Sequence, residues 1–273
     1  MKLKSIRLIY FSATGTTQTI VRRIGAGLSR AWNVPVHEHD FTLPAARAQE
    51  IVCGPDELAL VGTPVYAGRV PNVLLPFLRT MLSGGGAPAV PVVLFGNRNY
   101  DDALIELRDL LEAAGFHTIG GAAFVGEHSF STVLAAGRPD AADLQTADDF
   151  AALLVQRTAA WSAVPEQPVP VPGETPLRPY YTPRDRQGRP VNILKVRPLV
   201  RETCDNCGLC AEVCPMGSID RADVRRYTGI CIKCGACIKK CPQAARYYDD
   251  AGYLYHQHEL EEGYTRRAQP ELF

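Results

Sequence analysis

The sequence predicts an α/β fold, a doubly wound five-stranded parallel sheet, followed by a small cysteine-rich α+β domain. Strand-like and helix-like segments alternate over residues 1–161, and eight of the nine cysteines fall between Cys204 and Cys241. Alternating strands and helices are typical of a parallel sheet covered by helices on both faces. With 273 residues, of which 46% are hydrophobic, the chain is long enough for one large and one small domain.

The predicted elements follow one another along the first 161 residues. Strands are expected at Ser5–Phe11, Val34–Phe41, Glu57–Val65, Ala89–Asn97 and His117–Gly126. Helices are expected at Thr16–Ala31, Asn72–Leu82, Tyr100–Ala114 and Ala141–Trp161. The third and fourth strands are nearly continuous apolar runs, as in strands that are buried on both faces. Ligands of such sheets bind beyond the carboxyl ends of the strands, so the loops after strands one, three and four predict one shared pocket.

An internal duplication dominates the C-terminal part. The segment CDNCGLCAEVCP (Cys204–Pro215) recurs 27 positions later as CIKCGACIKKCP (Cys231–Pro242). Each copy has the C-x2-C-x2-C-x3-C-P pattern of bacterial two-cluster ferredoxins, in which the fourth cysteine binds the other copy's cluster. We therefore expect two [4Fe–4S] clusters. The first is assigned to Cys204, Cys207, Cys210 and Cys241, and the second to Cys231, Cys234, Cys237 and Cys214.

Two zinc sites and a disulfide framework are the alternatives for these cysteines. Zinc modules usually present two separated cysteine pairs, whereas disulfide frameworks are typical of secreted proteins. Gly208 and Gly235 are expected to let the backbone pass close to the clusters. The ninth cysteine, Cys53, precedes a predicted strand and is expected to be an inert, part-buried thiol.

The loop SATGTT (Ser12–Thr17) lies between the first strand and the first helix. It has neither GxGxxG nor the lysine of a P-loop, which disfavours a nucleoside triphosphate with magnesium. Its hydroxyls, its backbone N–H groups and the helix N-terminus suit an enclosed monophosphate. The alternative is a helix that is simply capped by threonines.

Three loops resemble those of flavodoxins. SATGTT resembles their T/S-x-T-G-x-T phosphate loop, and GTPVYAGRVP and GNRNYDDAL resemble the two loops that hold the isoalloxazine ring in that family. With the cysteine repeats, the chain resembles the flavodoxin–ferredoxin fusion proteins of anaerobes. The resemblance implies bound FMN with these contacts: Ser12, Ala13, Thr14, Gly15, Thr16, Thr17, Thr63, Pro64, Val65, Tyr66, Ala67, Gly68, Gly96, Asn97, Arg98, Asn99 and Tyr100.

Within this set, Tyr66 and Tyr100 are the candidates for stacking on the flavin, with ordinary loop packing as the alternative. His128, after the fifth strand, is a candidate for supplying or taking a proton, and a surface histidine without a role is the alternative. Basic residues near the cysteines are expected to offset cluster charge, to raise the reduction potential or to dock an acidic partner, unless they form an ordinary solvated surface. They are Arg225, Arg226, Lys233, Lys239 and Lys240.

These observations divide the chain into four predicted parts. Residues 1–164 form a flavodoxin-like FMN-binding domain, and residues 165–198 form a proline-rich linker. Residues 199–248 form the two-cluster domain, and residues 249–273 form a tail. At about 3.1 Å per residue the extended linker could span about 100 Å, so the docking of the two domains is not predicted.

Clusters exchange single electrons and FMN takes one or two, so the combination predicts an electron-transfer protein. The expected partner is a ferredoxin-like donor or an acceptor enzyme. A reductase of a small-molecule acceptor, fed by the clusters, and a redox sensor or scaffold are the alternatives. The net charge of zero disfavours a nucleic-acid surface, and no apolar run reaches the roughly 18 residues of a membrane span. We expect a cytoplasmic protein. The sequence does not decide whether it forms a homo-oligomer.

Overall fold

The computed structural model describes residues 3–185 and 187–273. Its helices are α1 (Thr16–Trp32), α2 (Leu75–Thr80), α3 (Ala103–Ala113), α4 (Ala141–Ala159), α5 (Leu209–Glu212), α6 (Ala236–Lys239) and α7 (Ala251–Gly263), with 3-10 turns η1 (Pro44–Ala48) and η2 (Asn72–Leu74). Its strands are β1 (Ser5–Tyr10), β2 (Val36–Asp40), β3 (Ile51–Val52), β4 (Glu57–Pro64), β5 (Leu82–Ser83), β6 (Pro88–Phe95), β7 (His117–Thr118), β8 (Ala122–Val125), β9 (Leu199–Val200), β10 (Arg246–Tyr247) and β11 (Glu271–Leu272).

Five parallel strands form the centre of the molecule, in the order β2-β1-β4-β6-β8. Counted along the chain this order is 2-1-3-4-5, the order of flavodoxin-like doubly wound sheets, so the predicted fold class is confirmed. The predicted fifth strand is divided into β7 and β8. Gly121, between them, exchanges two backbone hydrogen bonds with Phe273, of 3.1 and 2.8 Å, which starts the antiparallel pairing of β11 with β8.

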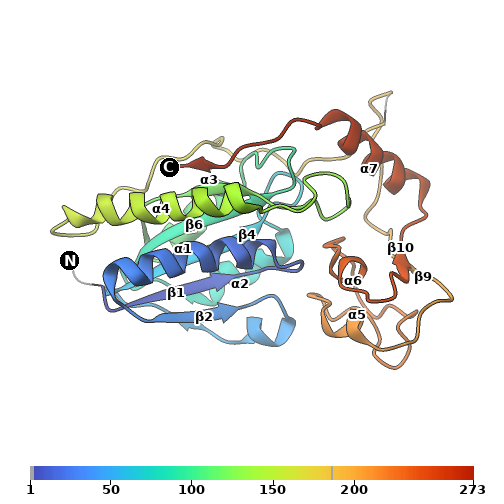
Figure 1. Cartoon of the computed structure of the whole chain (residues 1–273), viewed down its shortest axis with the longest axis horizontal. Coiled ribbons are helices and arrows are strands. Elements are labelled where there is room, and N and C mark those ends of the chain that lie inside the picture. Colours follow the sequence, from blue (N-terminus) through green and yellow to red (C-terminus); the bar gives the residue numbers. More distant parts are fainter. Residues whose placement is uncertain (1–2, 186) are drawn as a thin grey trace.

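Helices cover both faces of this sheet (Figure 1). On one face α1 and α4 pack through Ile20, Ile24 and Phe150 onto alternate side chains of the strands, such as Leu8 and Leu60. On the other face α2 and α3 pack through Phe77, Leu104 and Leu107 onto the intervening side chains, such as Ile9 and Val61. The period-2 alternation of strand side chains therefore divides one sheet between two cores.

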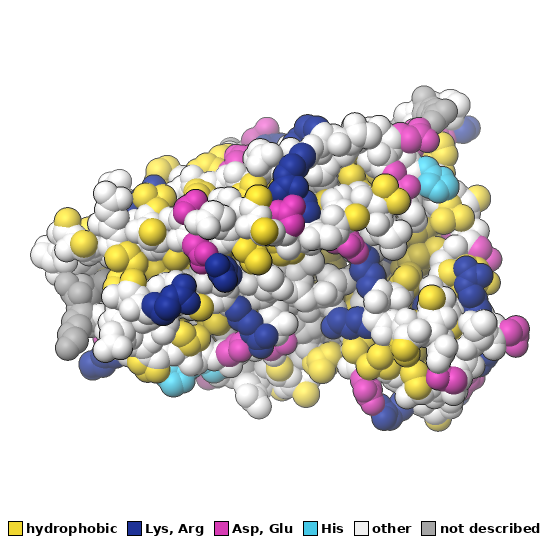
Figure 2. Space-filling view, viewed as in Figure 1, with side chains coloured by type: hydrophobic (Ala, Val, Ile, Leu, Met, Phe, Trp, Pro, Cys, Tyr) yellow, Lys and Arg dark blue, Asp and Glu magenta, His cyan; other side chains and the backbone are white. Residues whose placement is uncertain are grey.

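Charges of both signs are interspersed over the face that carries α1 and α4 (Figure 2). On this part of the chain Arg22 pairs with Glu38 at 2.6 Å, and Arg23 pairs with Asp148. No helix among the described residues is long and apolar enough to cross a membrane.

The proline-rich segment runs back along the α/β part. The buried carboxylate of Asp102 accepts hydrogen bonds from the N–H groups of Glu174 and Arg178, at 3.1 and 2.7 Å, and pairs with the Arg178 guanidinium at 2.9 Å. Further along, the Tyr180 hydroxyl donates to the Val70 carbonyl at 2.9 Å. These contacts fix a segment that composition alone describes only as extended.

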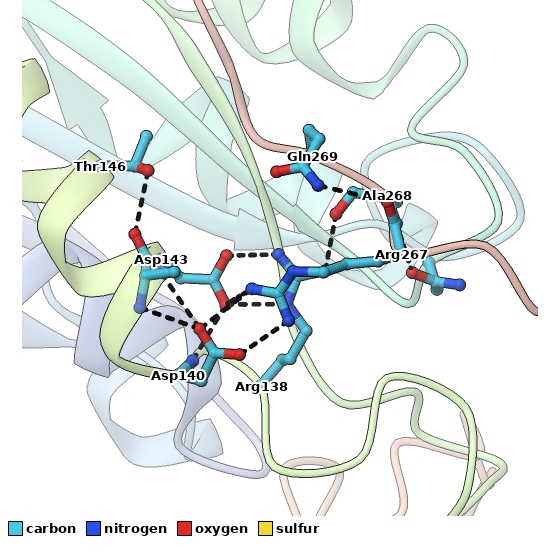
Figure 3. Close-up of polar contacts among 9 residues, drawn as sticks. Arg138, Asp140, Asp143, Thr146, Arg267, Ala268 and Gln269 are labelled. Atoms are coloured by element: carbon cyan, nitrogen blue, oxygen red, sulfur yellow. Dashed lines mark hydrogen bonds and ion pairs between the residues drawn. The ribbon is translucent and has the colours of Figure 1, made fainter.

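The segment after α7 also returns to the sheet. Arg138 is buried, pairs with the buried carboxylate of Asp143 at 2.8 Å and donates to the Ala268 carbonyl at 2.7 Å (Figure 3). Beside it, the more exposed Arg267 pairs with Asp140, the N-cap residue of α4. The residues that follow form β11, so the predicted tail completes the edge of the sheet.

We predict that Arg138→Met lowers the free energy of unfolding by about 3–5 kcal/mol, because the buried Asp143 carboxylate keeps only the Asp140 N–H and the more distant Arg267 guanidinium, 4.0 Å away. Arg267→Ala, which removes a half-exposed partner, should cost at most about 1 kcal/mol. Urea unfolding followed by circular dichroism under anaerobic conditions measures both changes. Equal losses in the two variants would show that the buried pair does not anchor the returning segment.

Candidate functional site

Two cavities in the cysteine-rich part are each lined by four cysteines. Cys204, Cys207, Cys210 and Cys241 line a cavity of about 320 Å³, here called the outer cavity. Cys214, Cys231, Cys234 and Cys237 line a cavity of about 370 Å³, called the inner cavity. In each, the fourth cysteine of one repeat lies with the first three cysteines of the other, which is the grouping that the C-P pattern predicts.

The chemistry around these thiols fits [4Fe–4S] clusters. Backbone N–H groups point at ligand sulfurs, from Ser218 to Cys214 Sγ at 3.4 Å and from Ala245 to Cys241 Sγ at 3.3 Å. Burial raises the pKa of the Cys234 thiol to about 12, and positive charge from a bound cluster would favour its thiolate form. Among the described residues no three metal-binding side chains converge on a single-ion site, as they would around one zinc ion with Zn–S distances of about 2.3 Å.

A third cavity lies at the carboxyl edge of the sheet, where the ends of β1, β4, β6 and β8 meet. This loop cavity has a volume of about 470 Å³. It is lined by Ala13, Thr14, Thr16, Thr17, Pro64, Val65, Tyr66, Leu94, Phe95, Gly96, Gly126, Glu127, His128, Ser129 and Cys234. The shared pocket that the three loops predict is therefore present, with a fourth wall from the segment after β8.

The β1 end of the loop cavity is a neutral cradle of donors. Gly15 takes φ +98°, a left-handed conformation that favours glycine, and turns the chain into α1. Among the described residues, the backbone N–H groups of residues 13–17 have no hydrogen-bond partner, whereas the next one, of Gln18, donates to Ser12 Oγ at 3.0 Å. Unpaired N–H groups at a helix N-terminus fit the phosphate of FMN.

A fourth cavity, of about 820 Å³ including its open mouth, lies between the α/β part and the second cysteine repeat. This interdomain cavity is lined by Val65, Tyr66, Ala67, Arg98, His128, Ser129, Phe130, Tyr181, Pro183, Ile193, Leu194, Ile232, Lys233, His256 and Leu260. It shares Tyr66 and His128 with the loop cavity and Lys233 with the inner cavity, and the loop and inner cavities share Cys234. The phosphate cradle and the inner cysteines are therefore connected through adjoining cavities.

The second repeat is held against this edge by Lys239. Its ammonium pairs with Glu127 at 2.5 Å and donates to the carbonyls of His128 and Ser131, at 2.6 and 3.0 Å. Gly235 allows the close approach, since a Cβ at this position would lie 2.6 Å from the Ser129 carbonyl oxygen. Lys239 is one of the basic residues expected to offset cluster charge, raise the reduction potential or dock an acidic partner, and in the structure its ammonium is engaged in this internal contact.

Ten of the seventeen residues expected to contact FMN line the loop or interdomain cavity. The other seven do not: Ser12, Gly15, Thr63, Gly68, Asn97, Asn99 and Tyr100. Tyr100 is 5% exposed, packs against Phe95 and donates to Glu271 at 2.7 Å, so it belongs to the core rather than to a stacking face. The buried Asn97 amide donates to the carbonyls of Tyr264 and Arg266, at 2.7 Å each, and so holds the segment after α7.

Tyr66 and His128 line both the loop cavity and the interdomain cavity, and so separate the two. Burial, and secondarily the charge of Lys239, lowers the pKa of His128 to about 3, so its ring is neutral at physiological pH. Nδ1 accepts the Phe130 N–H at 3.1 Å, which assigns the ring proton to Nε2. His128 is therefore a hydrogen-bond donor in a cavity wall rather than a surface histidine.

Several lining residues carry no signal in the sequence. Tyr181 and Leu194 come from the proline-rich segment, and His256 and Leu260 come from α7. Their positions depend on the docking of distant segments, which no local pattern encodes. By contrast Cys53, 2% exposed and with its pKa raised by burial to about 11, has the properties expected of an inert thiol.

Comparisons with known proteins match the two parts separately. The family model of the 4Fe-4S dicluster domain matches residues 203–246. Among solved structures, a flavodoxin from the domain Archaea has a TM-score of 0.42 and 15% identity, over 57% of this chain and 99% of that one. A Streptococcus pneumoniae flavodoxin gives 0.38 and 19%, over 56% and 99%, and flavodoxin 2 from Bacillus cereus gives 0.40 and 16%, over 56% and 99%.

No curated protein matches the chain in sequence. At these identities the assignment of the N-terminal part rests on its 2-1-3-4-5 strand order, and that of the C-terminal part on the family match and the eight cysteines. The chain therefore joins a flavodoxin-like α/β fold to a 4Fe-4S dicluster domain.

Proposed function

We propose that this protein transfers electrons between its two [4Fe–4S] clusters and an FMN bound at the loop cavity. The observation that carries the proposal is Cys234, which lines both the inner cavity and the loop cavity. Clusters exchange one electron each, and FMN takes one or two together with protons. The proposed partner is a separate one-electron carrier that meets the outer cavity, where Cys207 is exposed.

The residues around the loop cavity have distinct parts in this proposal. The N–H groups of residues 13–17 and the hydroxyls of Thr14 and Thr16 hold the phosphate. The side chain of Tyr66 packs beside the flavin ring, and His128 directs its Nε2 proton to the ring's polar edge. Lys239 neutralises Glu127, whose carboxylate would otherwise repel the phosphate.

The interdomain cavity favours a second candidate function, reduction of a small molecule. Its outer walls are apolar, with Ile193, Leu194 and Leu260, and its mouth is open. A cavity of this kind beside a flavin suits a substrate as well as a cofactor. Turnover that saturates with the concentration of a small acceptor would favour the reductase, whereas exchange only with another carrier protein favours the relay.

The first test is cofactor content after anaerobic purification. We expect eight irons and one FMN per chain, and an absorption spectrum in which the flavin contributes in addition to the clusters. Zinc in place of iron would overturn the cluster assignment, and a chain with eight irons that fails to bind added FMN would overturn the relay.

Thr14→Asp places a carboxylate in the phosphate cradle and should weaken FMN binding by at least about 100-fold, or about 2.7 kcal/mol. Riboflavin, which has no phosphate, should bind equally to both proteins, and iron content should stay unchanged. Thr19→Asp, on the exposed side of α1, is the matched control. Equal loss of riboflavin and FMN would show that the loop does not bind the phosphate.

Lys239→Met should slow electron transfer from the inner cluster to FMN by at least about tenfold, because the second repeat loses its anchor on the segment after β8. Lys240→Met removes the same charge from the neighbouring, exposed position and should leave the rate unchanged. Flash photolysis with a one-electron photoreductant measures both rates. A similar effect of the two substitutions would contradict the anchoring role.

His128 should make the protein less stable as the pH falls below about 6.5. Its pKa of about 3 in the folded chain lies below the ordinary value of about 6.5, so the unfolded chain binds more protons between these limits. The contribution of neutral His128 to the free energy of unfolding is fully present above pH 6.5 and is lost as the pH falls from 6.5 toward 3. His128→Gln should reduce the slope between pH 5 and 6.5 by up to about 1.4 kcal/mol per pH unit, measured by urea unfolding. Unchanged slopes would mean that the ring is already protonated in the folded chain.

A further inference from the structure

At one of the positions where the two cysteine repeats differ along the walls of these cavities, an isoleucine of the first repeat corresponds to an arginine of the second. Ile219 follows the fourth cysteine of the first repeat, and Arg246 stands 27 positions later, at the same place in the second. Ile219 lines the inner cavity and Arg246 lines the outer cavity. The backbones are equivalent, since Ile219 pairs with Tyr227 as Arg246 pairs with Val200.

Arg246 brings a charged donor directly to a ligand sulfur. Its side chain is 4% exposed, and its Nη2 donates to Cys210 Sγ at 3.1 Å and to the Val224 carbonyl. Its Nη1 donates to the Tyr227 hydroxyl at 2.9 Å, and this hydroxyl donates to the Pro198 carbonyl at 2.9 Å. Among the described residues no carboxylate pairs with Arg246. Its charge acts first on Cys210 of the outer cavity, which it contacts, and second on Cys237 of the inner cavity.

The inner cavity has a buried cation of its own, but with different contacts. Lys233 donates to the carbonyls of Leu194 and Cys231, at 2.7 and 3.0 Å. No hydrogen bond from Lys233 to a sulfur is found among the described residues. The outer cavity therefore differs from the inner one in having a side-chain hydrogen bond to a ligand sulfur from a permanently charged group.

A [4Fe–4S] unit with four thiolates is negatively charged, and reduction adds another negative charge. A neighbouring positive charge and an N–H···S hydrogen bond both stabilise the reduced form more than the oxidised form. We propose that Arg246 raises the reduction potential of the cluster in the outer cavity, above the value that this site would have with the isoleucine of the sister repeat.

This deepens the proposed function, because a higher potential makes the outer cluster a better acceptor for an electron that arrives from the partner. It rests on the clusters of that proposal and not on the flavin. A chain with eight irons that bound no FMN would overturn the relay to flavin and would leave the potential of the outer cluster measurable.

The test is an anaerobic redox titration followed by electron paramagnetic resonance. In Arg246→Ile the equilibrium constant for reduction of the outer cluster should fall at least tenfold, which is about 59 mV for one electron. Arg225→Ile, which removes an exposed charge nearby, is the control and should shift it by much less. Cys207→Ser, a change confined to the outer cavity, identifies the signal of the outer cluster.

Arg246→Lys keeps the charge, whereas Arg246→Gln keeps a donor without the charge. The outer-cluster potential of the lysine variant should lie closer to the wild-type value than that of the glutamine variant. Both variants are compared as protein with eight irons per chain. If Arg246→Ile does not assemble its clusters, the comparison of Arg246→Lys with Arg246→Gln still tests the proposal. An outer-cluster potential that is the same in wild type, Arg246→Lys and Arg246→Gln would overturn the proposal, as would equal shifts in Arg246→Ile and Arg225→Ile.

Discussion

The contact on which the rest of the arrangement depends is the one made by Lys239. Its side chain is 15% exposed, and its ammonium contacts the Glu127 carboxylate and two backbone carbonyls of the segment after β8. Removing one partner of this partly buried pair leaves the other charge without its counterion and weakens the contact between the second repeat and this segment. This contact, together with the hydrogen bond from Arg47 to the Pro215 carbonyl, holds the cysteine repeats against the α/β part, where Cys234 lines the loop cavity.

The parts of this protein that depend on local pattern are predictable from its sequence. Period-2 and apolar strands predict the parallel sheet because they reflect local chain geometry. The duplicated C-x2-C-x2-C-x3-C-P pattern predicts which cysteines line each cavity, because this pattern pairs the fourth cysteine of each repeat with the other repeat. Tyr100 illustrates the limit. Its place in the third loop suggests a stacking role, but a carboxylate from the far end of the chain, Glu271, accepts its hydroxyl and keeps it in the core.

The interdomain cavity is unpredictable for a related reason. Its walls come from four parts of the chain: the loops of the sheet, the proline-rich segment, the second repeat and α7. Each segment is fixed by long-range polar contacts, such as those of Asp102 with Glu174 and Arg178. Composition gives the reach of such segments but not the side of the molecule on which they lie.

The pairing of β11 with β8 changes how the architecture is best described. Along the chain, the cysteine repeats come after β8 and before β11, and these two strands are neighbours in one sheet (Figure 1). In topological terms the dicluster domain is an insertion within the α/β domain rather than an appendage to it. The residues that complete the edge of the sheet are synthesised after the cysteines, so β11 can pair with β8 only once the whole dicluster domain has been made.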